Sequence, residues 1–108
     1  MAIPENIRNS VIKFCSEVSK IFDIERMLLF GSYASGTFKE YSDIDIAVQI
    51  RNKNSVDKIE IGKKLWKIAG DVDIRIEPKI FFSDDYDPNE PASIFNYILR
   101  TGIDIPIN

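Results

Sequence analysis

The chain has 108 residues, of which 44% are apolar and 29% charged, with a formal net charge of -3. This length suits one compact domain rather than two, and the acidic excess argues against a nucleic-acid binder that relies on bulk positive charge. Histidine is absent, which excludes serine–histidine catalysis and histidine metal sites. Any chemistry must therefore use carboxylates, hydroxyls, lysines, arginines or a bound metal ion.

Cysteine usage and hydropathy bear on location. The single cysteine can form no disulfide within the chain, which is typical of a reducing cytoplasm. No apolar run approaches the length of a membrane span, and the N-terminus lacks the apolar stretch of a secretory signal. We therefore expect a cytoplasmic protein with no membrane contact.

The first predicted element is an amphipathic helix from Pro4, which suits a first helical turn, to about Phe22. Its apolar residues recur at helical spacing: Ile7, Val11, Phe14, Cys15, Val18, Ile21 and Phe22. Because Cys15 belongs to this stripe, we expect a buried, unreactive thiol.

An apolar run at 27–30 predicts a buried strand over about 26–30 that ends in a turn at Gly31-Ser32. Gly31 has no Cβ, so the backbone can turn sharply there and approach a ligand closely. The Ser32 hydroxyl can donate to a phosphate oxygen. We expect a short helical segment within 33–37, and Gly36 allows a second turn.

A second strand, predicted at 43–50, opens with Asp43-Ile44-Asp45. Alternate residues of a strand share a face, so the two aspartates point together. Two such charges about 4 Å apart repel by about 4 kcal/mol near a protein surface, and a divalent cation removes that repulsion. Mg²⁺ is typically bound by one or two carboxylates together with phosphates and water.

The alternative is a half-buried sheet whose aspartates merely face solvent. For Asp43 and Asp45 we disfavour it, because strands are depleted in aspartate and this pair follows a Gly-Ser turn. The stretch therefore predicts a phosphate-binding turn followed by a metal-binding carboxylate pair.

Ser55 is a plausible N-cap for a second main helix that ends at Gly70, with Trp66 as a core anchor. A last helix is predicted from Glu90-Pro91 to about Thr101 and is stopped by Gly102. The tail at 103–108 is expected to pack on its own domain or to join a partner.

A third strand is predicted at 71–77 from its alternating pattern, with Pro78 at its end and an apolar extension at 79–82 that could form an edge strand. If this strand neighbours the second, Asp73 can join Asp43 and Asp45 as a third carboxylate. A solvent-facing Asp73 is the equally weighted alternative.

Two motifs together resemble the signature of the DNA polymerase β-like nucleotidyltransferases: Gly31-Ser32-Tyr33-Ala34-x-Gly36 and Ser42-Asp43-x-Asp45. The chain resembles most their smallest members, the minimal nucleotidyltransferase (MNT) proteins that act as antitoxins beside HEPN-domain toxins. The resemblance implies a single domain over 1–108 and an α+β fold. That fold has a small mixed sheet of three to four strands with helices packed on one face.

The resemblance also implies site residues. Asp43, Asp45 and a third aspartate on a later strand would be catalytic and would bind two Mg²⁺ ions. Gly31 and Ser32 would bind the nucleotide, with ATP as the substrate. We assign the third aspartate to Asp73.

The competing choice for the third aspartate is Asp71, which lies beside Gly70 at the start of the predicted strand. Lys39 or Arg75 could add positive charge near the phosphates, although each is more simply explained as a surface residue.

The function implied by the resemblance is transfer of AMP from ATP to a tyrosine of a partner HEPN toxin, which neutralises that toxin. Little of the chain remains outside the catalytic core, so a partner protein is the simplest acceptor. Two alternatives stay open. One is a catalytically silent antitoxin that acts by binding alone, and the other is a nucleotidyltransferase with a small-molecule acceptor such as an antibiotic. The second would need a partner subunit or dimer, and no direct nucleic-acid contact is expected.

Overall fold

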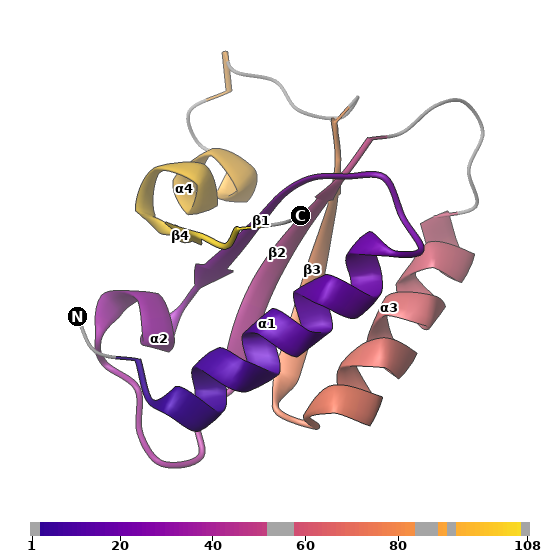
Figure 1. The fold of residues 1–108 in the computed structure, drawn as a ribbon. Helices are drawn as coiled ribbons and strands as arrows, with labels where there is room; N and C mark the ends of the chain where they lie inside the picture. Colours follow the sequence, from indigo (N-terminus) through magenta and orange to yellow (C-terminus); the bar gives the residue numbers. More distant parts are fainter. Residues whose placement is uncertain (1–2, 52–57, 84–88, 91–92, 107–108) are drawn as a thin grey trace.

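The computed structural model describes residues 3–51, 58–83, 89–90 and 93–106. These residues fold into a four-stranded mixed sheet with the strand order β3-β2-β1-β4, flanked by helices (Figure 1). The α+β class with a small mixed sheet is therefore confirmed. Within the described residues, no helix combines the length and the apolar character needed to cross a membrane.

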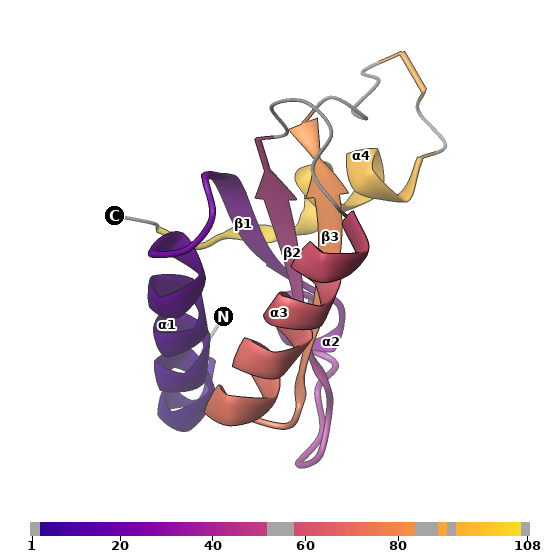
Figure 2. The same ribbon diagram turned by 90° about the vertical axis from the view of Figure 1, so that its right-hand side faces the viewer.

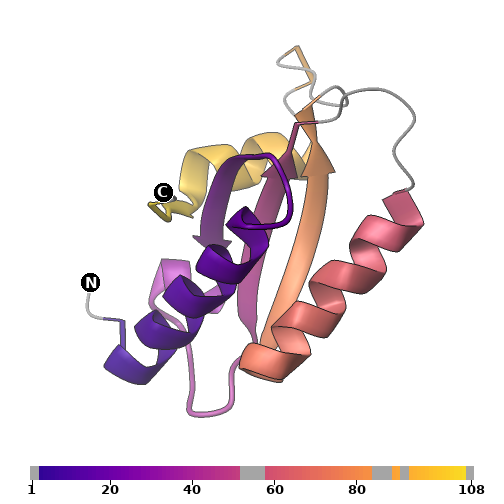
Figure 3. The same cartoon turned by 45° about the vertical axis from the view of Figure 1, so that its right-hand side comes forward.

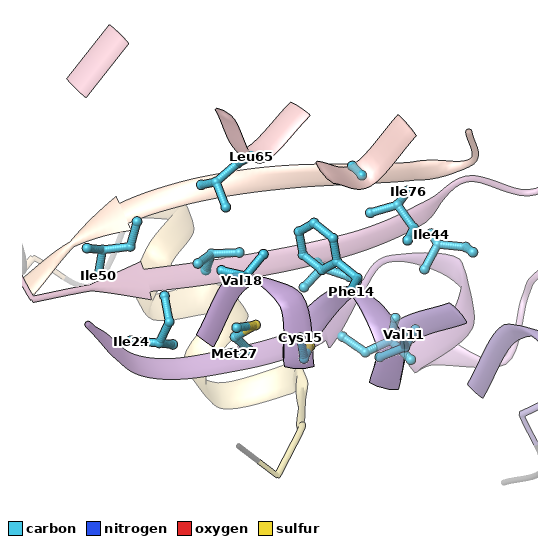
Figure 4. Packing of buried hydrophobic residues seen from close by; sticks show 14 of the residues in the cluster. Val11, Phe14, Cys15, Val18, Ile24, Met27, Ile44, Ile50, Leu65 and Ile76 are labelled. Atoms are coloured by element: carbon cyan, nitrogen blue, oxygen red, sulfur yellow. The ribbon is translucent and has the colours of Figure 1, made fainter. Parts of the chain in front are cut away.

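The first helix, α1, spans Glu5–Ser19 and follows Pro4, which occupies its N-cap position. Five of the predicted apolar residues are buried against the sheet: Ile7, Val11, Phe14, Cys15 and Val18. Figure 4 shows Val11, Phe14, Cys15 and Val18 beside the strands. The helix ends before the predicted Phe22, and Ile21, predicted to belong to the stripe, is exposed. Cys15 is buried as expected, and burial raises the pKa of its thiol to about 12. The thiol is therefore protonated and unreactive at neutral pH.

The next elements follow the prediction closely. Strand β1 spans Ile24–Phe30, helix α2 spans Ser32–Ser35 and strand β2 spans Ile44–Ile50. β1 and β2 pair antiparallel, which sets Phe30 opposite Asp45. The Gly-Ser turn and the second aspartate of the motif therefore lie next to each other in the sheet.

Helix α3 spans Lys58–Val72 in the described part of the chain, so the predicted stop at Gly70 is wrong. Its buried residues, Ile61, Leu65 and Ala69, recur at four-residue spacing. Trp66 follows Leu65 by about 100° around the helix and is 52% exposed, so its prediction as a core anchor is wrong as well. The predicted N-cap Ser55 lies outside the described residues.

Strand β3 spans Ile76–Phe82, five residues later than predicted. The chain at 71–75 completes α3 and the turn that follows, so Asp73 does not lie on a strand. Pro78 lies in the middle of β3 rather than at its end. β3 is the edge strand of the sheet, where the missing N–H of proline is tolerated.

Helices cover both faces of the sheet. α1 and α3 pack on one face, where they enclose the main core, and α4 (Ile94–Thr101) lies on the other face (Figures 2 and 3). On that second face Ile98 packs on Leu28 and Ala47. The expectation that the helices pack on one face therefore holds for α1 and α3 but not for α4.

The C-terminal tail packs on its own domain. α4 begins after Ser93, whose hydroxyl accepts a hydrogen bond from the Asn96 N–H, and Gly102 caps its end as predicted. Strand β4, Ile103–Asp104, then pairs antiparallel with β1. Arg26 of β1 donates to both carboxylate oxygens of Asp104 at 2.8 and 2.9 Å, which fastens this edge. The predicted helix start at Pro91 lies outside the described residues.

Candidate active site

The motif residues lie together at one end of the strands, where β1 ends and where β2 and β3 begin (Figure 1). Gly31 follows the last residue of β1, and Asp43 precedes the first residue of β2. Asp45 and Glu77 are the second residues of β2 and β3, and the parallel register sets them directly beside each other. Three strand ends therefore bring a glycine turn and three carboxylate residues to one place.

Gly31 connects the two halves of the motif. Its backbone has φ 74° and ψ -147°, a conformation that residues with a side chain rarely adopt. A Cβ at Gly31 would also collide with Oδ2 of Asp45, because that carboxylate fills the space beside the glycine. Glycine is thus required twice: for the turn itself and for the close approach of Asp45.

Helix α2 fixes the position of Ser32, which is its first residue. The Ala34 and Ser35 N–H groups donate to the Gly31 carbonyl at 3.1 and 3.0 Å. Gly36, with φ 84°, ends the helix and donates to the Ser32 carbonyl at 3.0 Å. Within the described part of the chain, the structure shows no hydrogen bond made by the Ser32 hydroxyl, which leaves it able to donate to a ligand.

A short loop carries the chain from α2 to the aspartates. Ser42 closes this loop, because its hydroxyl accepts from the Lys39 N–H at 2.7 Å and its own N–H donates to the Lys39 carbonyl at 3.1 Å. The buried Tyr33 anchors the other end by stacking on Phe38, with 4.7 Å between the ring centroids. Ser42 in the motif therefore has a structural role in presenting Asp43.

Asp45 is electrostatically strained. Burial raises the pKa of its carboxyl, and the nearby Glu77 and Asp43 carboxylates raise it further, whereas Lys79 acts in the opposite direction. The negative charges of Glu77 and Asp43 therefore repel that of Asp45, and the positive charge of Lys79 partly offsets this repulsion. A bound cation would relieve this repulsion.

The structure pairs Asp73, the predicted third carboxylate, with Arg75 rather than setting it beside Asp45. Its side chain is 11% exposed and accepts hydrogen bonds from Arg75 Nε at 3.0 Å and Nη2 at 2.7 Å. It also accepts from the Ser10 hydroxyl at 3.1 Å. Ser10 belongs to α1, which covers the face of the sheet opposite to α4. Asp45 and Glu77 point to the α4 face, because they alternate along their strands with core residues that point toward α1.

The Arg75 guanidinium holds the pKa of Asp73 at about 2, the largest of several influences in that direction. Asp73 is therefore an internal ion-pair partner. Glu77, not Asp73, is the carboxylate that neighbours Asp45.

The two proposed cations have other neighbours in the structure. The Arg75 side chain pairs with Asp73. Arg75 and Lys39 both line a cavity of about 290 Å³ beside Pro4 and Ile7 of the N-terminal segment. Lys79 of β3, which the sequence analysis did not single out, is the cation whose charge reaches Asp45.

The carboxylates fit a magnesium ion that arrives with its substrate. Among the residues that the structure describes, no three acidic, cysteine or histidine side chains converge closely enough to form a complete metal site. Mg²⁺ does not require one, because it is commonly held by one or two carboxylates plus substrate phosphates. The strained Asp45, with Asp43 and Glu77 near it, supplies that kind of donor set.

A cavity of about 570 Å³ opens beside the glycine turn. Its described lining comes from the end of β1, from α2 with the residues that follow it, and from α4: Phe30, Gly31, Ser32, Ala34, Ser35, Thr37, Ile94, Tyr97, Ile98 and Thr101. None of these side chains is charged. The helix α4 thus forms one wall of the site region, a contribution that the sequence analysis did not anticipate.

Glu77 was missed because the third strand was predicted too early. The alternation at 71–77 predicts a strand with Pro78 at its end. The signal for the true strand is the row of apolar residues at every second position, Ile76, Pro78, Ile80 and Phe82, in a segment that matches β2 in length. Read in that frame, Glu77 is the one carboxylate on the strand and occupies the same position as Asp45 on β2.

This sheet, with a Gly-Ser turn after one strand, two aspartates at the next and a carboxylate on the third, defines a nucleotidyltransferase core of the polymerase β-like type. The family model of the nucleotidyltransferase domain matches residues 9–99, so the chain belongs to this family.

Two known proteins illustrate the similarity. The chain is 32% identical over 72 residues to the putative protein adenylyltransferase MJ0141 of Methanocaldococcus jannaschii, covering 64% of this chain and 73% of that protein. In fold it is similar to a chain in the crystal structure of a toxin-antitoxin with AMP-PNP, with a TM-score of 0.62 at 24% identity. That match covers 97% of this chain and 75% of the other.

Proposed function

We propose that this protein transfers AMP from ATP, with Mg²⁺, to a hydroxyl group of a partner protein. The observation that carries the proposal is the contact between Asp45 and the backbone of Gly31, with Asp43 and Glu77 near the same carboxylate. It joins a phosphate-binding turn to a set of mutually repelling carboxylates.

The proposed reaction forms one bond and breaks another. The acceptor oxygen bonds to the α-phosphorus of ATP, the bond from that phosphorus to the α,β-bridging oxygen breaks, and pyrophosphate leaves. Such phosphoryl chemistry depends mainly on positioning and on stabilising charge. When bound, Mg²⁺ would supply charge neutralisation for the phosphates, held by Asp43 and Asp45.

The chain's own residues would have distinct roles. The backbone at Gly31 and the Ser32 hydroxyl would hold the β- and γ-phosphates, since both border the open cavity. Glu77 would accept the proton of the acceptor hydroxyl, because it lies beside Asp45 and is exposed. Asp45 would lie between the phosphate-binding turn and Glu77.

We propose that the acceptor is a tyrosine of a HEPN-domain toxin and that the protein acts as its antitoxin in the cytoplasm. Similarity to MJ0141, named as a protein adenylyltransferase, supports a protein acceptor. A neighbour in fold that comes from a toxin-antitoxin structure containing AMP-PNP supports both the partner class and the nucleotide.

The strained carboxylates favour an enzyme over an antitoxin that acts by contact alone. Grouping Asp43, Asp45 and Glu77 opposes folding, because like charges repel. A contact inhibitor gains nothing from that arrangement. A transferase needs it to bind the metal ion that accompanies ATP.

The direct test uses ATP labelled either at the α-phosphate or at the γ-phosphate, with the protein and the partner that purifies with it from its native cell. We expect the partner to acquire the α-label with Mg²⁺ and not the γ-label, and the toxin's activity to fall in parallel. The Asp43→Asn/Asp45→Asn variant should transfer no label, whereas Asp71→Asn, an exposed aspartate paired with Lys67, should be unaffected.

Two outcomes would contradict the proposal. Equal neutralisation of the toxin by the double variant would support the contact-only antitoxin. Transfer of the label to an added small molecule and not to the partner would support a small-molecule acceptor.

A further inference from the structure

Lys79 lies on the same face of the sheet as the carboxylates. It is two residues after Glu77 in β3, so the two side chains share a face of that strand. The parallel register sets Lys79 beside Ala47, and Ala47 is two residues after Asp45 in β2. Lys79 thus occupies the row next to Asp45 and Glu77, and it is exposed.

The Lys79 charge acts on the site. It lowers the pKa of Asp45 against the opposing influence of burial, Glu77 and Asp43. Within the part of the chain that the structure describes, Lys79 forms no salt bridge that would hold its ammonium group away from a ligand. An exposed lysine beside carboxylates is a mobile point charge that can also bind a phosphate oxygen.

Three arginines of the sheet and its connections are held in ion pairs. Arg26 is paired with Asp104, Arg75 with Asp73, and Arg51 with Asp23. Lys39 lines a separate cavity with α1. Lys79 is therefore the cation best placed to meet the negative charge of a nucleotide bound over Asp45.

The positions of the turn and of Lys79 indicate which phosphate it meets. Gly31 and Ser32 follow β1, on one side of Asp45, whereas Lys79 is on β3, on the other side. If the terminal phosphates lie at the turn, the α-phosphate lies toward Glu77 and Lys79. We propose that Lys79 binds the α-phosphate of the nucleoside triphosphate, an inference that rests on the proposed function.

Calorimetric titration with Mg²⁺ present tests this inference with two probes, ATP and inorganic pyrophosphate. We expect Lys79→Met to raise the Kd for ATP about 10-fold and to leave the Kd for pyrophosphate unchanged, because pyrophosphate has no α-phosphate. Lys79→Arg, which keeps the charge, should stay within about threefold of wild type for ATP. Lys13→Met removes the same charge from an exposed position on α1 and should match wild type for both probes.

Each result bears on the inference. ATP binding by Lys79→Met equal to wild type would overturn it, even if the melting temperature fell, because Lys79 would then only offset carboxylate repulsion. Equal weakening for ATP and pyrophosphate would assign Lys79 to the leaving group and overturn the α-phosphate contact. Failure of folded wild type to bind ATP would contradict the proposed function and this inference together, whereas normal wild-type binding with an unaffected Lys79→Met variant would contradict this inference alone.

Discussion

Asp45 is the residue of the proposed site that is constrained both by close packing and by neighbouring charges. Its carboxylate occupies the space beside Gly31, and its pKa is raised by burial and by two neighbouring carboxylates. The glycine of the Gly-Ser turn and the second aspartate of the motif therefore lie side by side in the folded protein. Changes to either partner test that contact directly.

Gly31→Ala should destabilise the fold and disturb the site, because the new Cβ meets the Asp45 carboxylate and the backbone conformation is strained for alanine. We expect a loss of roughly 1–3 kcal/mol in the free energy of unfolding, measured by urea titration, together with loss of ATP binding. Gly36→Ala is the matched control: its φ of 84° should cost about 1 kcal/mol without affecting Asp45. Retained ATP binding by a folded Gly31→Ala variant would show that the contact is dispensable.

Asp45→Asn should stabilise the protein in the absence of ligands. The folded state raises the pKa of this carboxyl above its ordinary 3.8, so ionisation opposes folding at pH 7, and the opposition develops as the pH rises through that range. Removing the charge should raise the free energy of unfolding by up to about 1 kcal/mol. Adding Mg²⁺ with ATP should raise the melting temperature of wild type but not that of the variant. Destabilisation of the ligand-free variant at pH 7 would contradict this account of the site.

At the scale of the elements, the turn between α3 and β3 positions the strand that carries Glu77. Asp73 accepts hydrogen bonds from Arg75 and from Ser10 of α1, and the Arg75 carbonyl accepts from the Ile44 N–H at 2.8 Å. This network ties α1, α3, β3 and the start of β2 together. The order of the elements from α1 to α4 was predictable from the sequence, because apolar spacing marks most of them, whereas β4 was not predicted as a strand.

The start of β3 was not predictable from alternation alone. The same pattern of apolar and charged residues at 71–77 serves a helix end, a turn and a strand start. The hydrogen bonds of Asp73 determine where the turn lies, and these partners come from distant parts of the chain. The proximity of Gly31 and Asp45 could be expected from the sequence because their spacing is local, whereas the position of Glu77 beside Asp45 depends on the register between β2 and β3.

Asp73→Asn should lower stability in a pH-dependent way. The folded state lowers this pKa from 3.8 to about 2, mainly through Arg75, so its contribution is fully present above about pH 4 and is lost as the pH falls toward 2. We expect urea titration at pH 7 to show a loss of about 1–2 kcal/mol, because the side chain is 11% exposed. The difference from wild type should shrink steadily between pH 4 and pH 2. A difference that stayed constant over that range would mean that the Asp73 charge is not responsible.

At the scale of the whole molecule, the helices on the two faces of the sheet have different roles. α1 and α3 enclose the main core on one face of the sheet, while the carboxylates and Lys79 alternate onto the other face, where α4 borders the site region. The main core of this small domain lies on one side of the sheet, and the proposed site lies at one end of the other side. The class of fold follows from this arrangement, whereas the acceptor belongs to the proposed function.

The measurement that tests the central claim most directly is calorimetric titration of ATP into the protein with Mg²⁺ and again with a chelator. Wild type should bind ATP only with Mg²⁺, the Asp43→Asn/Asp45→Asn variant should show no binding, and the Asp71→Asn control should match wild type. Binding that is independent of Mg²⁺ or unchanged in the double variant would contradict the claim that these carboxylates form a metal–nucleotide site.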